Sequence, residues 1–202
     1  LGSGFKIAAH DMELRGVGNF LGEAQSGHVA AVGYEMYTNL LEEAIFEIKG
    51  EEHSLAPEPA LRLKLTTHIP EDYINQTTLR LTIYKRLAMA EHLEDVEQIA
   101  SELSDRFGRL PEPVEYLILT MKLKVLAKRC WIRLLKQETK RFVINFDPRT
   151  KLDVEHIQKL VDRDADRFKW ISATELAMGF KLGKEALAFD ALQKFLISIS
   201  DS

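Results

Sequence analysis

Residues 93–108, LEDVEQIASELSDRFG, carry the clearest periodic pattern in this 202-residue chain. Apolar side chains recur there at a spacing of three or four positions, at Leu93, Val96, Ile99, Ala100, Leu103 and Phe107. The spacing predicts an amphipathic helix with one apolar face. Gly108 is expected to end this helix, because glycine readily adopts the left-handed conformation that follows many helices.

The segments around this helix predict an α+β fold. Residues 61–70 alternate apolar and polar side chains, which predicts a strand, and residues 71–92 predict a helix capped by Asp72 or a neighbouring Asn or Thr. Further along we expect a helix, a hairpin, a helix, one or two strands and a last helix, over residues 110–130, 131–146, 153–164, 169–183 and 185–200. Strands at both ends with helices between them imply a small sheet covered by helices.

Composition divides the chain at a pair of prolines. Residues 1–59 carry 3 Lys or Arg and 10 Asp or Glu, whereas residues 60–202 carry 24 and 21. We therefore expect a loop and a long helix within residues 1–50, a linker over 51–59, and a compact α/β domain over 60–202.

Several kinds of chemistry are not expected from this sequence. It contains no phosphate-binding glycine loop, and its six histidines are too scattered for a zinc site. We thus expect no catalytic residue, no metal and no cofactor within this chain. The single cysteine, Cys130, favours a buried thiol and a reducing compartment, the cytoplasm. No apolar run approaches the roughly 18 residues of a membrane span, so no membrane partner is expected.

Residues 122–141 are rich in basic side chains. Eight are present against one acid, Glu138, and they are Lys122, Lys124, Lys128, Arg129, Arg133, Lys136, Lys140 and Arg141. Such a run can contact a phosphate backbone, so a freestanding nucleic-acid-binding α+β module is one reading of the chain. Alternation with apolar residues favours the other reading, the solvent-facing side of a helix and a hairpin.

A glycine-rich stretch, DMELRGVGNFLGEAQSGH at residues 11–28, holds one arginine and one glutamine. Arg15 supplies a rigid, permanently charged fork for a carboxylate or phosphate, and the Gln25 amide can both donate and accept hydrogen bonds. Glycines allow such a loop to change its path. These properties suit a loop that moves when neighbouring parts of a protein close.

The stretch resembles the motif that follows the second motor lobe in RecG-type helicases and in bacterial transcription-repair coupling factors. The matching residues are Phe5, Ala8, Asp11, Glu13, Arg15, Gly16, Gly18, Gly22, Gln25, Ser26 and Gly27. Residues 70–91 and 102–117 resemble the C-terminal domain of the coupling factors, which RecG-type helicases lack. The resemblance covers residues 1–131 and fades over 132–202. The chain therefore looks like a C-terminal piece that begins inside the second motor lobe.

The resemblance implies a role within a larger enzyme, a double-stranded DNA translocase that uses ATP and Mg²⁺. That enzyme displaces stalled RNA polymerase and recruits the excision-repair protein UvrA. The residues expected to couple ATP hydrolysis to DNA movement are Asp11, Glu13, Arg15, Gly16 and Gln25. This chain lacks the ATP-binding motifs, so no ATPase activity is expected from it alone.

For residues 60–202 the resemblance implies autoinhibition, in which this domain covers the enzyme's own N-terminal UvrA-binding module. Glu102, Asp105 and Arg106 match the family's contact surface. Their spacing places them on one helix face, opposite Leu103 and Phe107. An ordinary solvated polar face is the alternative.

In the full-length enzyme, Arg15→Ala or Gln25→Ala should leave ATP hydrolysis largely intact and abolish translocation. The reason is that both residues lie on a glycine-hinged loop outside any nucleotide-binding motif. Triplex-strand displacement, measured beside ATP turnover, is the test. Displacement by both variants at the wild-type rate would contradict the coupling role.

Overall fold

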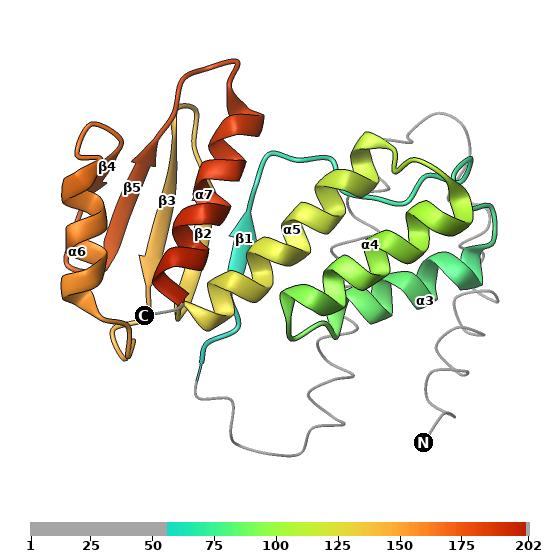
Figure 1. Cartoon of the computed structure of the whole chain (residues 1–202), viewed down its shortest axis with the longest axis horizontal. Coiled ribbons are helices and arrows are strands. Elements are labelled where there is room, and N and C mark those ends of the chain that lie inside the picture. Colours follow the sequence, from blue (N-terminus) through green and yellow to red (C-terminus); the bar gives the residue numbers. More distant parts are fainter. Residues whose placement is uncertain (1–55, 201–202) are drawn as a thin grey trace, which may run out of the picture. The chain divides into compact units, whose positions relative to one another are not determined.

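The structure is a computed structural model that describes residues 56–200 (Figure 1). The predicted motor-lobe segment 1–50 lies outside the described residues, and with it the coupling residues Asp11, Glu13, Arg15, Gly16 and Gln25. Most of the predicted linker, 51–55, lies outside them as well. The described part contains helices and a five-stranded sheet, so the predicted α+β class is confirmed.

Ten elements follow one another in the described residues. The strands are β1 (Ala60–Arg62), β2 (Ile132–Gln137), β3 (Arg141–Phe146), β4 (Phe168–Trp170) and β5 (Glu175–Gly179). The helices are α3 (Thr77–Ala88), α4 (Leu93–Phe107), α5 (Glu112–Arg129), α6 (Val154–Arg163) and α7 (Glu185–Ser200). The strand order is β1-β2-β3-β5-β4, in which only the β1–β2 pair is parallel.

One face of the sheet carries the main apolar core. Leu135, Ile144 and Met178, from the three central strands, are almost fully buried on this face. The C-terminal half of α5 lies on this side of the sheet together with α6 and α7 (Figure 1). Apolar side chains of these helices belong to the same core cluster. The ring of Phe142 lies 4.9 Å from that of Phe180 and 4.9 Å from that of Phe189, between centroids.

The most strongly patterned predictions are confirmed. Helix α4 ends at Phe107, and Gly108 follows it with a φ of 84°. The hairpin turns between β2 and β3 as expected, where the Glu138 amide donates to the Arg141 carbonyl at 2.8 Å. The predicted strand region 169–183 forms two strands, β4 and β5, and α7 spans the predicted residues.

The helix predicted over residues 71–92 is too long at its beginning. The buried guanidinium of Arg80 donates from Nη1 to the carbonyls of Ile74 (2.7 Å) and Asn75 (3.3 Å). Its Nη2 donates to Glu71 Oε1 at 2.9 Å. In a continuous helix those carbonyls would accept from backbone amides four residues on. Because the Arg80 side chain binds these carbonyls instead, the chain before α3 forms a turn and not a helix.

The predicted cap and end of α3 are also wrong. Gln76 is the N-cap, and no side chain caps it. Asp72 lies in the preceding turn. The helix ends at Ala88, and His92 already belongs to the start of α4, where its amide donates to Asp95 Oδ2 at 3.0 Å.

The strand predicted over residues 61–70 forms only as β1. Its outermost pairing joins Arg62 to Lys136, and β2 ends one residue later at Gln137. Beyond this last pair, the Lys64 amide donates to the side chain of Gln137, at 2.8 Å from Oε1, and not to a carbonyl of the β2 ladder. The alternation of apolar and polar residues is real, since Leu61, Leu63 and Leu65 pack against the core.

Cys130 follows α5 and is buried, as predicted. Its Sγ lies 3.3 Å from the carbonyl oxygen of Leu196 in α7. The thiol therefore contributes to the contact between these two helices.

Leu192→Ala should lower the free energy of unfolding by about 2–5 kcal/mol, because this α7 side chain is fully buried and its truncation leaves a cavity. Leu187→Ala on the same helix is the matched control. Leu187 is 64% exposed, so its truncation should change stability by no more than about 0.5 kcal/mol. Urea unfolding of both variants measures the difference. Equal effects would contradict the packing of α7.

Candidate partner-binding face

Helix α4 turns its apolar side inward and a charged side outward. Val96, Ile99 and Leu103 are buried where α4 packs against α5 and α3. The outward side near the end of the helix carries Glu102 and Arg106, one turn apart. This charged end of α4 is the surface that the sequence predicts to contact a partner.

Glu102 is held by two arginines. Its Oε2 accepts from Arg86 Nη1 of α3 at 2.6 Å, and its Oε1 accepts from Arg106 Nη1 at 2.8 Å. Both ion pairs lie at the surface, where the side chains are between about a third and a half exposed. The carboxylate thus joins α3 to α4 and orients both guanidinium groups before any partner binds.

Arg106 does not point away from Phe107 as predicted. Its guanidinium carbon lies over the Phe107 ring, 5.2 Å from the centroid. The ring is only partly buried, so the arginine can cover it and still reach Glu102. A cation held over an aromatic face is attracted by the negative charge density of the ring.

Tyr73 supports the same end of α4 from the chain before α3. Its ring meets that of Phe107 edge to face, with 5.8 Å between centroids. Its hydroxyl lies 3.0 Å from the Leu103 carbonyl and 3.1 Å from the Gly108 carbonyl, both of which can accept its proton. Burial raises the pKa of Tyr73 above its ordinary value, so the hydroxyl stays protonated and available as a donor.

Asp105 differs from its neighbours. It is exposed, and its side chain makes no hydrogen bond or ion pair with any residue in the range 56–200. Its carboxylate is therefore available to a cationic group of a partner. The three predicted contact residues therefore differ in their pairing. Glu102 and Arg106 are paired with each other, whereas the Asp105 side chain is unpaired.

The hydrogen bond from Arg86, and after it that from Arg106, lowers the pKa of Glu102 from its ordinary value of 4.5. A lowered pKa means that the pairing stabilises the fold above the ordinary value and that this contribution disappears as the pH falls through the folded-state pKa. The carboxylate is partly solvated, so the contribution should not exceed about 1 kcal/mol.

The described residues contain neither a candidate metal-binding group nor a candidate membrane-spanning helix. In residues 56–200 no group of three or more His, Cys, Asp or Glu side chains could hold a metal. In the same range, no helix has both the length and the apolar character needed to cross a membrane.

The basic run over residues 122–141 does not form one continuous cationic surface. Five of its eight basic side chains are paired with carboxylates in the described residues, and these pairs are Lys122–Glu97, Lys124–Glu58, Lys128–Glu58, Lys136–Glu138 and Arg141–Glu138. The pairing supports the reading of most of the run as a solvated face.

Sequence reasoning missed the two side chains that organise this face. Arg86 lies on the predicted helix before α4, but which of its residues faces Glu102 depends on the packing of α3 against α4. Tyr73 was assigned to a helix that does not form there. No local pattern marks either residue.

The fold and this face define an α+β domain in which helix α4 ends in a charged surface. A family model described as the TRCF domain matches residues 63–157. The transcription-repair-coupling factor of Myxococcus xanthus is 39% identical over 163 residues, which cover 81% of this chain and 14% of that protein. The Escherichia coli K12 protein of the same name is 31% identical over 207 residues, covering 100% of this chain and 18% of that protein.

A solved crystal structure, described as the C-terminal domain of transcription-repair coupling factor, has the same fold. It aligns with a TM-score of 0.64 at 20% identity, over 72% of this chain and 94% of that one. The chain belongs to the transcription-repair coupling factor family. It spans less than a fifth of the length of these two relatives.

Arg86→Ala should raise the pKa of Glu102, and by more than Arg106→Ala does, because the Arg86 hydrogen bond is the larger cause of the lowered value. Carboxyl carbon chemical shifts, followed by NMR as the pH falls, measure this pKa. A Glu102 pKa that neither substitution changes would show that these ion pairs do not persist in solution.

Proposed function

We propose that the chain is the C-terminal part of an ATP-dependent double-stranded DNA translocase that couples transcription to nucleotide excision repair. The complete protein would work in the cytoplasm, displace stalled RNA polymerase and recruit UvrA. ATP and Mg²⁺ would bind its motor lobes and not the domain described here. Support comes from family membership and from a match to the Escherichia coli relative along the whole chain.

Within that enzyme, residues 1–50 would couple ATP hydrolysis to DNA movement. Residues 60–202 would act as a regulatory domain that covers the enzyme's own N-terminal UvrA-binding module. The observation that carries the second role is the geometry at the end of α4. Arg106 is held in place by Glu102 and Phe107, and the unpaired Asp105 carboxylate stands beside it. A pre-oriented guanidinium next to a free carboxylate suits a partner surface that offers both charges.

The free energy needed to break this interdomain contact determines how much a substitution should increase UvrA binding. Loss of a charge-assisted contact at an interface costs about 2 kcal/mol or more when the partner's charge stays buried. We call the contact between the α4 end and the UvrA-binding module the clasp. If the clasp is weakened by that amount, the fraction of enzyme molecules in which the module is uncovered rises more than tenfold, at about 1.4 kcal/mol per factor of ten.

Full-length protein in which Glu102, Asp105 and Arg106 are all replaced by Ala should capture more UvrA than the wild type in a pull-down, and its unstimulated ATP turnover should rise. Asp105→Ala alone should give part of this effect while it leaves the Arg86–Glu102–Arg106 ion pairs in place. Asp166→Ala is the matched control, because Asp166 is an exposed carboxylate on the segment between α6 and β4.

UvrA capture by the folded triple variant at the wild-type level would mean that this end of α4 is ordinary solvated surface. If Asp166→Ala also increased UvrA capture, the increase would be due to the loss of any negative charge and not to the α4 end. Either result would contradict a specific clasp.

A further inference from the structure

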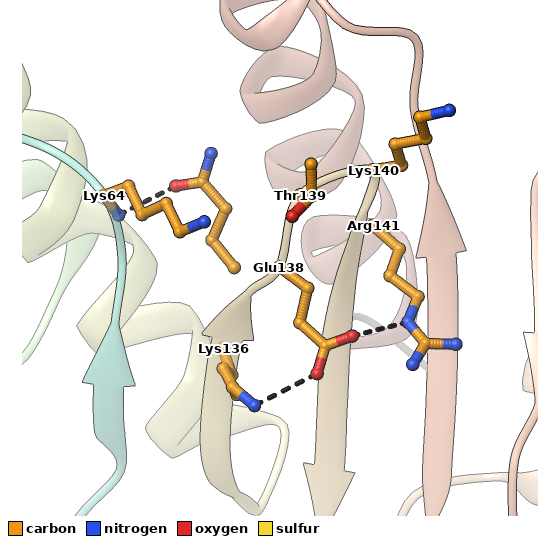
Figure 2. A pocket seen from close by; sticks show the side chains of 7 residues that line it. Lys64, Lys136, Glu138, Thr139, Lys140 and Arg141 are labelled. Atoms are coloured by element: carbon orange, nitrogen blue, oxygen red, sulfur yellow. Dashed lines mark hydrogen bonds and ion pairs between the residues drawn. The ribbon is translucent and has the colours of Figure 1, made fainter.

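An open hollow lies where the β2–β3 turn meets the chain that leaves β1. Its volume is about 580 Å³, and it is lined by Lys64, Lys136, Gln137, Glu138, Thr139, Lys140 and Arg141. Figure 2 shows Lys64 reaching towards the hairpin from the β1 side, while the other labelled residues come from β2, β3 and their turn. Two parts of the chain that are distant in sequence thus build one polar surface.

The hollow has an excess of positive charge. Four cationic side chains line it against one carboxylate, which leaves a surplus of three positive charges. Glu138 neutralises part of the set, since its two oxygens accept from Lys136 at 3.0 Å and from Arg141 at 2.7 Å (Figure 2). Lys64 and Lys140 are exposed and have no ion pair with any described residue.

A buried amide adds a hydrogen-bond donor to this surface. Gln137 is only 7% exposed, and its Oε1 is occupied by the Lys64 backbone amide. Its Nε2 has no hydrogen-bond partner among the described residues, although the residue lines the hollow. The Nε2 is not one of the buried side-chain atoms that lack a partner, so it is accessible from the hollow. An anion in the hollow can therefore accept from this amide and from the two unpaired lysines.

We propose that this hollow binds the phosphate backbone of duplex DNA without reading its sequence. It is open, as a site for one side of an extended polymer must be. None of its lining residues is aromatic, so it offers no platform on which the bases of a single strand could stack. Lysine, threonine and amide donors are the groups that contact phosphate oxygens. The site belongs to the described domain and does not depend on the proposed clasp at α4.

The charge surplus sets the expected salt dependence. Binding that neutralises about three phosphates gives a slope of about −2.7 for log K against log salt, or a loss of about 40-fold for a fourfold rise in salt. Replacing Lys64 and Lys140 by Gln leaves a surplus of about one, for which the slope is about −0.9 and the same change in salt costs only about 3.5-fold.

Fluorescence anisotropy of a labelled duplex, titrated with the full 202-residue chain between about 20 and 200 mM NaCl, tests the proposal. We expect measurable binding by the wild type and a slope that is less steep by about 2 for Lys64→Gln/Lys140→Gln. The matched control is Lys159→Gln/Lys169→Gln, which removes two exposed lysines from α6 and β4. This control should bind DNA as the wild type does.

A second variant tests the amide. Gln137→Glu keeps an oxygen for the Lys64 backbone amide and replaces the Nε2 donor by an acceptor, so it should weaken DNA binding. A thermal unfolding midpoint near that of the wild type would show that the fold is retained. Wild-type DNA affinity in this variant would overturn the role given to Gln137 and the site built around it.

Three further results would overturn the proposal as a whole. One is the absence of wild-type binding at the lowest salt, and another is an equal loss of binding in both lysine double variants. The third is displacement of the DNA by polyglutamate at an equal concentration of charges, which would identify an acidic protein segment as the preferred ligand. None of these outcomes affects UvrA capture through α4, so the two proposals fail separately.

Discussion

The structure depends on one helix, α5, which must be apolar on more than one side. Its first half, with Val114 and Leu117, is buried with α3 and α4, and its second half, with Leu123 and Leu126, belongs to the core beneath the sheet. A single helix therefore serves two packing layers, a helical one and a sheet-covering one (Figure 1). Because a rigid helix fixes the position of whatever packs on both of its ends, the charged end of α4 and the β2–β3 hairpin are held in one framework.

Charges on this framework fall into two groups. Most are already satisfied within the domain, as in the Arg86–Glu102–Arg106 set and the Lys136–Glu138–Arg141 set. Surface pairs of this kind add little stability but restrict the orientation of long side chains. Beside each set stand side chains without a partner in the described residues, Asp105 at the end of α4 and Lys64 with Lys140 at the hairpin. In both proposals, the paired charges hold the arginine side chains in place and the unpaired charges bind the partner. One domain would then present an acidic contact on α4 and a basic contact at the β2–β3 hairpin.

Sequence patterns predicted the elements well wherever periodicity and a local stop signal agreed. Helix α4 has both an apolar stripe and Gly108, and the β2–β3 hairpin has two apolar runs around a polar turn. Prediction failed before α3, where the mostly polar segment 71–76 suits a helix as well as a turn. The buried Arg80 decides between them by binding carbonyls from outside the helix. Whether this segment forms a helix or a turn depends on which donor reaches those carbonyls in the folded chain. Local helix and turn propensities do not contain that information.

By itself, the sequence determined the α+β class, the order of the elements, the buried Cys130 and the family, because these depend on residue types and their spacing along the chain. It also placed Glu102, Asp105 and Arg106 on one helix face. Only the tertiary structure decided that Arg86 binds Glu102, that Arg106 covers Phe107, and that the Lys64 amide meets Gln137. The last contact joins residues 73 positions apart in the chain. Contacts of that kind arise when separate elements pack and compete for the same donors and acceptors, and this competition is resolved only in three dimensions.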